Sequence, residues 1–300
     1  MKPMSKTAVV VNGCRGVGLA SAKALVESGL NVVVSDAEAS IAKAALDRID
    51  CANGQVQTYV GPVDSIDSAQ RLMCQAATAF GRVDVVVLNS GHVSTRSITG
   101  LNSFDLDSID TCLRSVIATA QAAAQQMTRQ ADGGRLLLVA PEASVRPVGM
   151  MGSVFITAGI RALARTLASE LADSGITVNA VIPASRAADP TQAYLAAYSD
   201  VREDDSLAAL PEPRSTGPRG VAALVAFLCL ETRGITGCSL GVGADTLSCW
   251  EDPHAATVVY NPEGWNADQI AEMWGTIAER CYEEGRRRWA PAQARVVKSN

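Results

Sequence analysis

Short runs of β-branched and other apolar residues alternate with longer, alanine-rich segments from residue 7 to about residue 183. The apolar runs read TAVVV, NVVVS, VQTYV, VDVVVL, GRLLLVA and ITVNAVI. Strands that are apolar throughout are buried on both faces, and a helix must return the chain before each next parallel strand. The alternation therefore predicts an α/β fold, a doubly wound parallel sheet covered by helices on both faces.

The helical period is clearest between residues 153 and 174. Aliphatic residues recur there every three or four positions, at Ile156, Ile160, Leu163, Leu167 and Leu171. This spacing places them on one face of a helix, and the following Ser174-Gly175 pair is typical of a helix end. Further along, GVAALVAFLCLE predicts one more helix and CSLGVGA a last short strand.

The composition changes after Trp250, where a turn-containing segment leads into a predicted helix from about Asn266. Ile270, Met273, Trp274 and Ile277 would share one side of this helix. We therefore predict one sheet domain over residues 1–250. Residues 251–300 are predicted to form a C-terminal helical extension that is not an independent domain.

Composition excludes several classes of function. Hydrophobic residues make up 48% of the chain, enough for a substantial core. The net charge of −5 provides no basic surface for nucleic acid, and no apolar run approaches the roughly 18 residues of a membrane span. The eight cysteines form no C-x-x-C pair and there are two histidines, so we expect no metal site. We expect a cytoplasmic protein with reduced cysteines.

A glycine-containing turn follows the first predicted strand in VVVNGCRGVGLA. Gly16 and Gly18 are placed so that backbone N–H groups at the start of the next helix could meet a pyrophosphate. Asp36 ends the second predicted strand, where a carboxylate would accept both ribose hydroxyls and repel a 2′-phosphate. This reading favours NAD over NADP. The alternative, that Asp36 only caps the following helix, stays open.

With these residues and several later ones, the chain resembles the short-chain dehydrogenase/reductase family over nearly its whole length, to about Gly243. Asp64 matches the family's adenine-binding aspartate, and LNSG, with Asn89 and Gly91, matches its Asn-Asn-Ala-Gly motif. Thr236-Gly237 follows in the expected order. The resemblance implies a Rossmann-type sheet that binds NAD. The tail is similar to the C-termini of hydroxyacyl-CoA dehydrogenase domains of peroxisomal multifunctional proteins.

The nucleotide turn departs from the family pattern Thr-Gly-x-x-x-Gly-x-Gly. Val11 and Asn12 stand where threonine and the first glycine belong, and Leu88 replaces the first asparagine of the later motif. Asparagine tolerates positive φ, but its side chain would stand near the phosphate path. At the nicotinamide end, Ala184 and Ala188 replace a glycine and a threonine. We expect weakened NAD binding, or no bound cofactor at all.

The family's catalytic residues are also replaced. Aligning on Ala158-Gly159 puts Ser153 at the tyrosine position and Thr157 at the lysine position, while Pro141 falls at the serine and Cys112 at the asparagine. A serine hydroxyl is too weak an acid near neutral pH, and threonine carries no cation to correct this. We therefore expect no intact catalytic set. Cys112 is a candidate nucleophile, although a packing role is favoured.

Three functions remain open at this point. The first is a non-catalytic subunit (a pseudoenzyme) that forms a hetero-oligomer, a dimer or tetramer, with an active NAD-dependent paralogue. By resemblance, that paralogue would be a hydroxyacyl-CoA dehydrogenase of the benzylsuccinate-pathway type or of fatty acyl-CoA degradation. The second is an oxidoreductase with an unconventional proton donor, for which His92 is the candidate. The third is a regulatory protein that senses NAD without turning it over.

Overall fold

A computed structural model of the chain divides into two compact units, Met1–Trp250 and Glu251–Asn300. The residues it describes are 5–91, 93, 96, 98–130, 132–141, 151–183, 217–230, 234–243, 247–250, 258, 260–262 and 264–273. Several residues singled out in the sequence lie outside these ranges, namely His92, Ala184, Ala188, Trp274 and Ile277.

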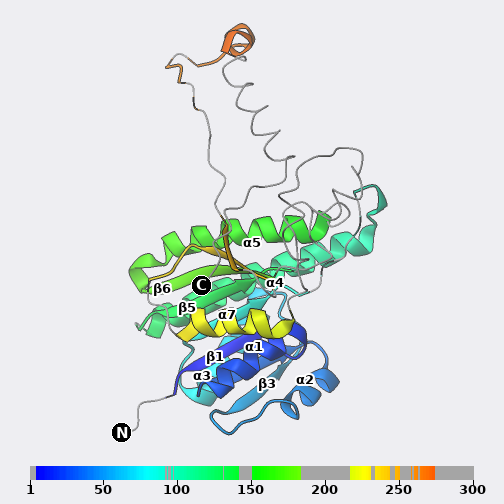
Figure 1. Ribbon diagram of the computed structural model, residues 1–300, viewed down its shortest axis with the longest axis vertical. Helices are drawn as coiled ribbons and strands as arrows, with labels where there is room; N and C mark the ends of the chain where they lie inside the picture. Colours follow the sequence, from blue (N-terminus) through cyan, green and yellow to red (C-terminus); the bar gives the residue numbers. More distant parts are fainter. Residues whose placement is uncertain are drawn as a thin grey trace, which may run out of the picture. The chain divides into compact units, whose positions relative to one another are not determined.

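The first unit is built on an eight-stranded sheet with the order β3-β2-β1-β4-β5-β6-β7-β8 (Figure 1). The strands are β1 (Thr7–Val11), β2 (Asn31–Asp36), β3 (Val56–Val60), β4 (Val85–Asn89), β5 (Gly134–Val139), β6 (Ile176–Pro183), β7 (Ser239–Val242) and β8 (Leu247–Trp250). The first seven are parallel to their neighbours, whereas β8 is antiparallel to β7. The predicted doubly wound parallel sheet is confirmed, and β8 is an addition that the sequence pattern did not predict.

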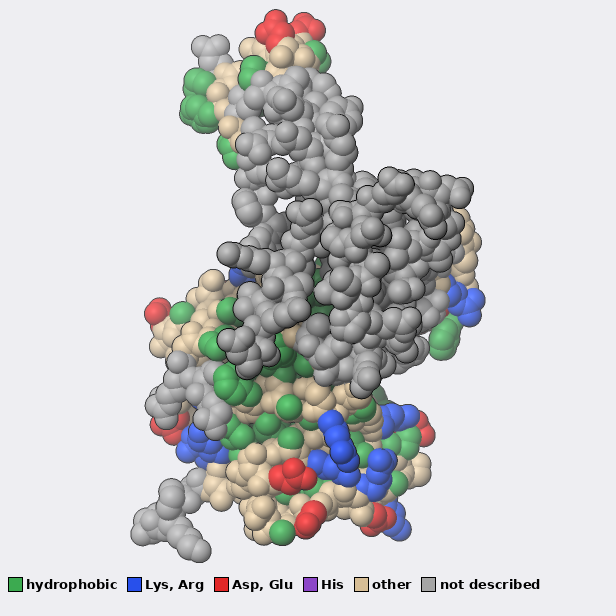
Figure 2. All heavy atoms as spheres, viewed as in Figure 1, with side chains coloured by type: hydrophobic (Ala, Val, Ile, Leu, Met, Phe, Trp, Pro, Cys, Tyr) green, Lys and Arg blue, Asp and Glu red, His purple; other side chains and the backbone are tan. Residues whose placement is uncertain are grey.

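Helices cover both faces of this sheet. They are α1 (Gly16–Glu27), α2 (Ala39–Leu46), α3 (Ile66–Phe80), α4 (Ser103–Gln130), α5 (Met151–Glu170) and α7 (Pro218–Leu230), with 3₁₀ turns η1 (Ile98–Gly100) and η2 (Ala172–Ser174). One buried cluster joins the sheet to α3, α4 and α5, and a second joins it to α1, α2 and α7. Figure 1 shows α1 and α7 side by side. Figure 2 shows hydrophobic side chains among polar ones on this face of the molecule.

Local sequence explains where these helices begin and end. At the start of α3, Ser65 and Ser68 exchange side-chain and backbone hydrogen bonds in a capping box. Gly81 ends α3 with a φ of 84°, a left-handed conformation that costs glycine nothing. The predicted helix over residues 153–174 corresponds to α5 and η2 together, and Gly175 ends it with a φ of 66°.

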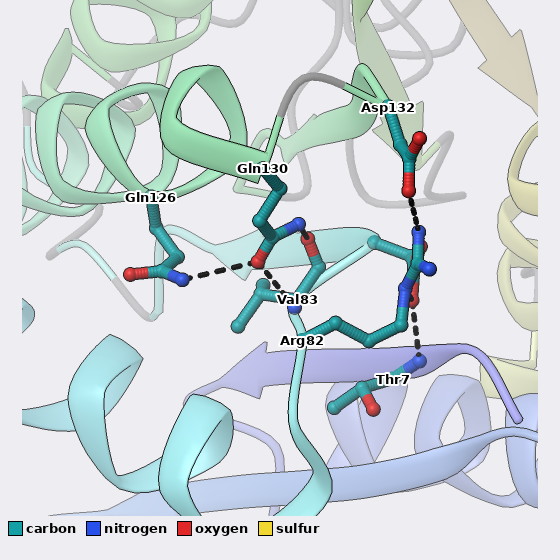
Figure 3. A network of polar contacts seen from close by, with 7 residues as sticks. Thr7, Arg82, Val83, Gln126, Gln130 and Asp132 are labelled. Carbon is teal, nitrogen blue, oxygen red and sulfur yellow. Dashed lines mark hydrogen bonds and ion pairs between the residues drawn. The ribbon is translucent and has the colours of Figure 1, made fainter. Parts of the chain in front are cut away.

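A buried acid, Asp84, joins strands at the amino edge of the sheet, and Figure 3 labels its partners Thr7 and Arg82. Asp84 accepts hydrogen bonds from Thr7 N at 2.8 Å and from Arg82 Nε at 2.8 and 2.9 Å. Arg82 Nη2 also lies 2.6 Å from Asp84 Oδ1 and 3.2 Å from Asp132 Oδ2. Hydrogen bonding to Asp84 raises the pKa of Arg82. The start of β1 is therefore fixed to the segment that precedes β4.

A glutamine at the end of α4 completes this edge (Figure 3). Gln130 Oε1 accepts from Val83 N at 2.8 Å, and Gln130 Nε2 donates to Val83 O at 2.8 Å. Gln126, one turn earlier, donates to Gln130 Oε1 at 3.0 Å. Both backbone groups of Val83 are satisfied in this way, so the entry into β4 needs no partner strand at that residue.

The antiparallel strand β8 is held by its tryptophan. Trp250 Nε1 donates to Ser248 Oγ at 3.1 Å, and Arg161 of α5 lies over the indole with its Cζ 5.0 Å from the ring centroid. On β7, a Cβ at Gly241 would collide with Ser248 and Trp250. Glycine at this position is what allows the two strands and the indole to pack.

In the second unit, residues 267–273 are helical. Asn266 Oδ1 accepts from Gln269 N at 2.9 Å, and Gln269 Oε1 accepts from Asn266 N at 3.0 Å. This reciprocal pair caps the helix and confirms its predicted start near Asn266. That the extension is not an independent domain stays a prediction. Among all helices the structure describes, none has the length and apolar character that crossing a membrane requires.

Candidate functional site

The residues predicted to bind a nucleotide converge where the strand order reverses, between β1 and β4. Val11 pairs with Leu88 at the carboxyl ends of these strands. The glycine turn of residues 12–15 leaves β1 there and enters α1, and Asp36 ends the neighbouring strand β2. In open α/β sheets, ligands bind at this switch point, outside the carboxyl ends of the strands.

The glycines of the turn have distinct roles. A Cβ at Gly18 would collide with Asn12 O and lie 3.0 Å from Asn89 Nδ2, so only glycine allows α1 to approach β4 this closely. Gly16 opens α1 with a φ of 52°, and a Cβ there would have no atom of the described residues within 4 Å. Arg15, at the N-cap, makes no side-chain capping bond. The Arg15 side chain therefore leaves the first N–H groups of α1 uncapped, and such groups are the donors that bind phosphate at a helix N-terminus.

Asn12 and Asn89 tie the two strand ends together. Asn12 Nδ2 donates to Asn89 O at 2.8 Å, and Asn89 Nδ2 donates to Val11 O at 2.8 Å. Among the described residues other than glycine, Asn12 alone has a positive φ, at 52°. The sequence led us to expect its side chain near the phosphate path. In the structure its amide binds β4, so Asn12 adopts a positive φ and adds a cross-link between the strand ends, and its distance from a bound phosphate stays a prediction.

Asp36 is already engaged. Its carboxylate is 6% exposed and accepts from Arg15 Nη2 at 3.0 Å, Arg15 Nε at 3.3 Å and Glu38 N at 3.1 Å. Arg15 Nη2 also lies 3.2 Å from Glu38 Oε1. The bonds to Asp36 and then to Glu38 raise the pKa of Arg15. Sequence reasoning missed Arg15, although a cation in the glycine turn could have signalled a partner for the expected carboxylate.

The remaining nucleotide positions lie on loops at the same edge. Gly91 follows β4 with a φ of 82°, and a Cβ there would lie 3.8 Å from Asn12 Nδ2. Asp64 lies half-buried between β3 and α3. Burial, and then the charge of Asp36, raise the pKa of Cys14 to about 11, while Arg15 opposes the shift. The Cys14 thiol in this turn is therefore neutral near pH 7.

Cys112 packs below this edge, on the buried side of α4. Its Sγ donates to Ser90 O at 3.1 Å, and burial raises its pKa to about 12. A thiol with so high a pKa is a poor nucleophile, because the thiolate is the reactive form. The geometry favours the packing role over the catalytic one. The side-chain hydroxyl of Ser90, whose backbone oxygen accepts from Cys112, has no hydrogen-bond partner among the described atoms.

Ser153 and Thr157 lie one turn apart on the buried face of α5. Thr157 Oγ1 is buried and has no hydrogen-bond partner within the described part of the chain. Pro141 is buried directly after β5. Of the four positions matched to the catalytic set, only Cys112 carries a titratable group, and that group stays protonated. These four side chains therefore provide no acid or base that changes charge near pH 7.

Metal chemistry finds no support in the described residues. Within those ranges, no three side chains of the His, Cys, Asp and Glu types come close enough to share a metal ion. The free cysteines there include the buried Cys14, Cys112 and Cys229 and the exposed Cys51 and Cys74.

Comparisons with known proteins extend these observations. A family model described as enoyl-(acyl carrier protein) reductase matches residues 11–244. The 3-oxoacyl-(acyl-carrier-protein) reductase of Staphylococcus epidermidis is 32% identical over 242 residues, which cover 80% of this chain and 98% of that protein. An L-rhamnose 1-dehydrogenase (NAD(P)(+)) of Azotobacter vinelandii is 29% identical, covering 79% of this chain and 94% of the relative.

Solved structures agree on the fold. A short chain dehydrogenase from Mycobacterium avium has a TM-score of 0.73 at 22% identity, covering 92% of this chain and 95% of that one. An acetoin dehydrogenase from Enterobacter cloacae has a TM-score of 0.65 at 25% identity, with 80% and 96% covered. The first of these matches includes a larger share of this chain than the second.

Proposed function

The chain belongs to the short-chain dehydrogenase/reductase family, and from this premise we propose that it is a non-catalytic member, a subunit that assembles with an active paralogue. One observation carries the proposal. The four positions that match the family's catalytic set hold Cys112, Pro141, Ser153 and Thr157, all buried and none able to exchange a proton near pH 7. A reductase needs such a group to protonate the oxygen that forms as hydride is delivered.

The size of the expected defect supports this choice. Removing one positioned acid or base lowers a rate by about 10²- to 10⁴-fold. Catalytic residues that act as a unit depend on one another, so losing one already removes most of the rate that the set provides. With all four replaced, no part of the family's proton-transfer set remains. Ser153 is also buried, with 2% of the residue exposed.

NAD is the nucleotide we propose for this subunit. The open N-terminus of α1, the close packing at Gly18 and the buried carboxylate of Asp36 support a working cradle for the adenosine half of a dinucleotide. Asn12 supports it as well, because its amide is bound to β4 rather than free in the turn. The nucleotide would then serve as a structural ligand that orders the subunit.

The outer faces of α4 and α5 support assembly with a homologous chain. Ile117 of α4 is 58% exposed and Phe155 of α5 is 55% exposed. Ala158 and Gly159 lie next to Phe155 on the exposed side of α5, and within the described part of the chain a Cβ at Gly159 would meet nothing within 4 Å. A large apolar anchor beside small residues permits close helix packing across an interface. We propose an active, NAD-dependent hydroxyacyl-CoA dehydrogenase-type paralogue as the occupant, in a dimer or tetramer.

Native mass spectrometry of the protein purified from its own host tests this function. A mixed assembly with a second dehydrogenase chain is the expected result, and a homo-oligomer that reduces 3-oxoacyl thioesters alone would contradict it. Phe155→Glu should break the mixed assembly, because it places a charge at the apolar face. Phe227→Glu, on α7, is the matched control and should leave the assembly intact. The opposite pattern would move the interface to α7.

The names of the relatives favour a second candidate, an oxidoreductase with an unconventional proton donor. It requires hydride transfer by the isolated chain, and this rate must be lost in Asp36→Arg. A third outcome, NAD bound without turnover beside a partner that is not a dehydrogenase, would identify a nucleotide-sensing protein. The same spectrum and one rate measurement separate these three functions.

A further inference from the structure

The asparagines at the ends of β1 and β4 carry an inference about how the glycine turn is held. We propose that Asn12 is a positioning residue: its side-chain amide fixes residues 12–15 in place before a nucleotide binds, and so places the first N–H groups of α1 for a phosphate. This inference rests on the proposed nucleotide-binding role of the turn. It assigns a function to the asparagine that stands where the family has glycine.

The first step is that the two asparagines link the strand ends through their side chains. Val11 and Leu88 pair at these ends, and both are fully buried apolar residues whose side chains cannot form hydrogen bonds. One residue further along each chain segment, Asn12 Nδ2 donates to Asn89 O and Asn89 Nδ2 donates to Val11 O, each at 2.8 Å. Each amide therefore binds the backbone of the opposite strand end.

The second step is that the turn is also bound to β2. Asn12 N donates to Ser35 Oγ at 3.2 Å, and Gly13 N donates to Ser35 O at 2.9 Å. Asn12 is thus bonded to both strands that flank β1, namely β2 and β4. Because these two N–H groups are occupied, the donors left for a phosphate lie at the start of α1, where Arg15 provides no side-chain cap.

The third step is the backbone conformation of Asn12. Its φ of 52° lies in the left-handed region, which a residue other than glycine keeps only where the surrounding structure fixes it. Glycine would adopt this conformation without strain, but it carries no amide. Asparagine therefore keeps the conformation and adds the bond to β4, which glycine cannot supply.

The position of Asn12 also determines where α1 begins. A Cβ at Gly18 would collide with Asn12 O and lie 3.0 Å from Asn89 Nδ2, so the first turn of α1 packs directly against the linked pair. A displacement of Asn12 would therefore displace or loosen the helix turn that carries the phosphate donors. Fixing these groups during folding lowers the ordering cost that binding would otherwise incur.

Titrations of the full chain with NAD, ADP and adenosine test this role, because adenosine lacks the phosphates. Asn12→Gly keeps the backbone conformation and removes the amide. It should bind NAD and ADP about 2- to 10-fold more weakly, the change expected for one hydrogen bond. Adenosine, followed by NMR, should bind with unchanged affinity. In hydrogen exchange of the free chain, the N–H groups of residues 12 and 13 should exchange faster in the variant.

Asn53→Gly is the matched control. Asn53 Nδ2 donates to Glu27 O at 3.2 Å, so this variant removes the same kind of bond at the other end of α1 and should change none of the three affinities. Asn12→Asp keeps the size of the side chain and its tolerance of positive φ but cannot donate, and should weaken NAD and ADP binding at least as much as Asn12→Gly. Thermal unfolding of each variant checks that it is folded at the titration temperature.

NAD binding by Asn12→Gly that equals or exceeds that of the parent overturns the positioning role. An equal weakening of adenosine binding overturns it too, because it would indicate a general loss of structure. A parent chain that binds neither NAD nor ADP overturns the proposed nucleotide and this inference together. Assembly and turnover do not enter these titrations, so the positioning role can fail while the non-catalytic subunit stands, and the reverse also holds.

Discussion

At the amino ends of β1 and β4, the buried carboxylate of Asp84 accepts hydrogen bonds from Thr7 N and Arg82, and Gln130 satisfies both backbone groups of Val83. At the carboxyl edge, Asn89 Oδ1, Ser90 Oγ and Thr157 Oγ1 are buried without a partner among the described residues. The same strands thus end in two different polar environments. Thr7 Oγ1 is an exception at the amino edge, since it too lacks a partner there.

This difference indicates that the amino edge contributes to stability and that the carboxyl edge is the place where a ligand would bind. Buried polar groups are nearly always paired, and those left unpaired are expected where a ligand or water completes the site. At the amino edge, side chains of the chain itself satisfy the backbone N–H of Thr7 and both backbone groups of Val83. The carboxyl edge retains buried polar atoms without a described partner, which agrees with the proposal of a subunit that binds a nucleotide without reacting.

The largest effect on stability should come from removing the Asp84 carboxylate at the amino edge. Asp84→Ala leaves Thr7 N and Arg82 without their acceptor, so we expect the free energy of unfolding to fall by about 2–4 kcal/mol. Asp110→Ala is the matched control. It removes an exposed ion pair with Arg114, at 2.7 Å, and should cost less than about 1 kcal/mol. Urea denaturation measures both, and equal losses would show that the amino-edge network is not special.

The cross-link at the carboxyl edge should come next. Asn12→Ala loses the hydrogen bond to Asn89 O and puts alanine at a φ of 52°, so we expect a loss of about 1–3 kcal/mol. Asn12→Gly loses the bond but fits the backbone, and should cost about 1 kcal/mol or less. If Asn12→Gly costs as much as Asn12→Ala, the lost side-chain bond, which both variants share, sets the cost and the left-handed conformation contributes little.

Alkaline pH should weaken the carboxyl edge through its buried thiol. Folding raises the pKa of Cys112 from 9.0 to about 12, so the folded protein keeps a proton that the unfolded chain loses. This contribution to stability is complete below pH 9 and is lost as the pH rises toward 12. We expect a loss of about 1.4 kcal/mol per pH unit from this thiol above pH 9. Denaturation midpoints between pH 8 and pH 10.5 measure it.

Two substitutions test the cause of this pH dependence, one at the buried thiol of Cys112 and one at the exposed thiol of Cys74. Cys112→Ala should reduce the decline above pH 9 without abolishing it, because burial also raises the pKa of Cys14 to about 11 and that of Cys229 to about 12. The variant also lowers stability at every pH by leaving a small cavity. Cys74→Ala, at an exposed thiol, should leave the slope unchanged. An unchanged slope in Cys112→Ala would mean that other groups cause the alkaline sensitivity.

The smallest effect should have the opposite sign. Thr157→Val replaces an unpartnered buried hydroxyl by a methyl group of similar size, and we expect a gain of up to about 1 kcal/mol. Thr166→Val, on the exposed side of the same helix, should change stability by less than about 0.5 kcal/mol. A clear loss in Thr157→Val would show that bound water or ligand satisfies this hydroxyl.

The fold could be predicted because its signal is repeated along the chain. Each parallel strand is a buried apolar run, and each needs a returning helix, so runs such as TAVVV and ITVNAVI fix the class. Strand β8 was missed since it is short, antiparallel and mostly exposed, and its contacts with Gly241 and Arg161 come from distant parts of the sequence.

The candidate site was predicted in part for the same reason. The spacing of Gly16, Gly18 and Asp36 follows from the path of the backbone, because a strand, a tight turn, a helix and a second strand must succeed one another. The structure brings the three residues to one edge of the sheet. The pairing of Arg15 with Asp36 spans 21 residues and depends on where a flexible side chain comes to lie. No local pattern encodes that choice, nor the turn of the Asn12 amide toward β4.

The short strand β8 also bears on the solubility of the chain. An open strand edge is a template for pairing with other molecules, and β7 would be such an edge if β8 were lost. Four residues, with Trp250 and Ser248 packed on Gly241, cover it. Truncation before Leu247 should therefore make the domain aggregate through the exposed edge of β7 under conditions in which its core is still folded.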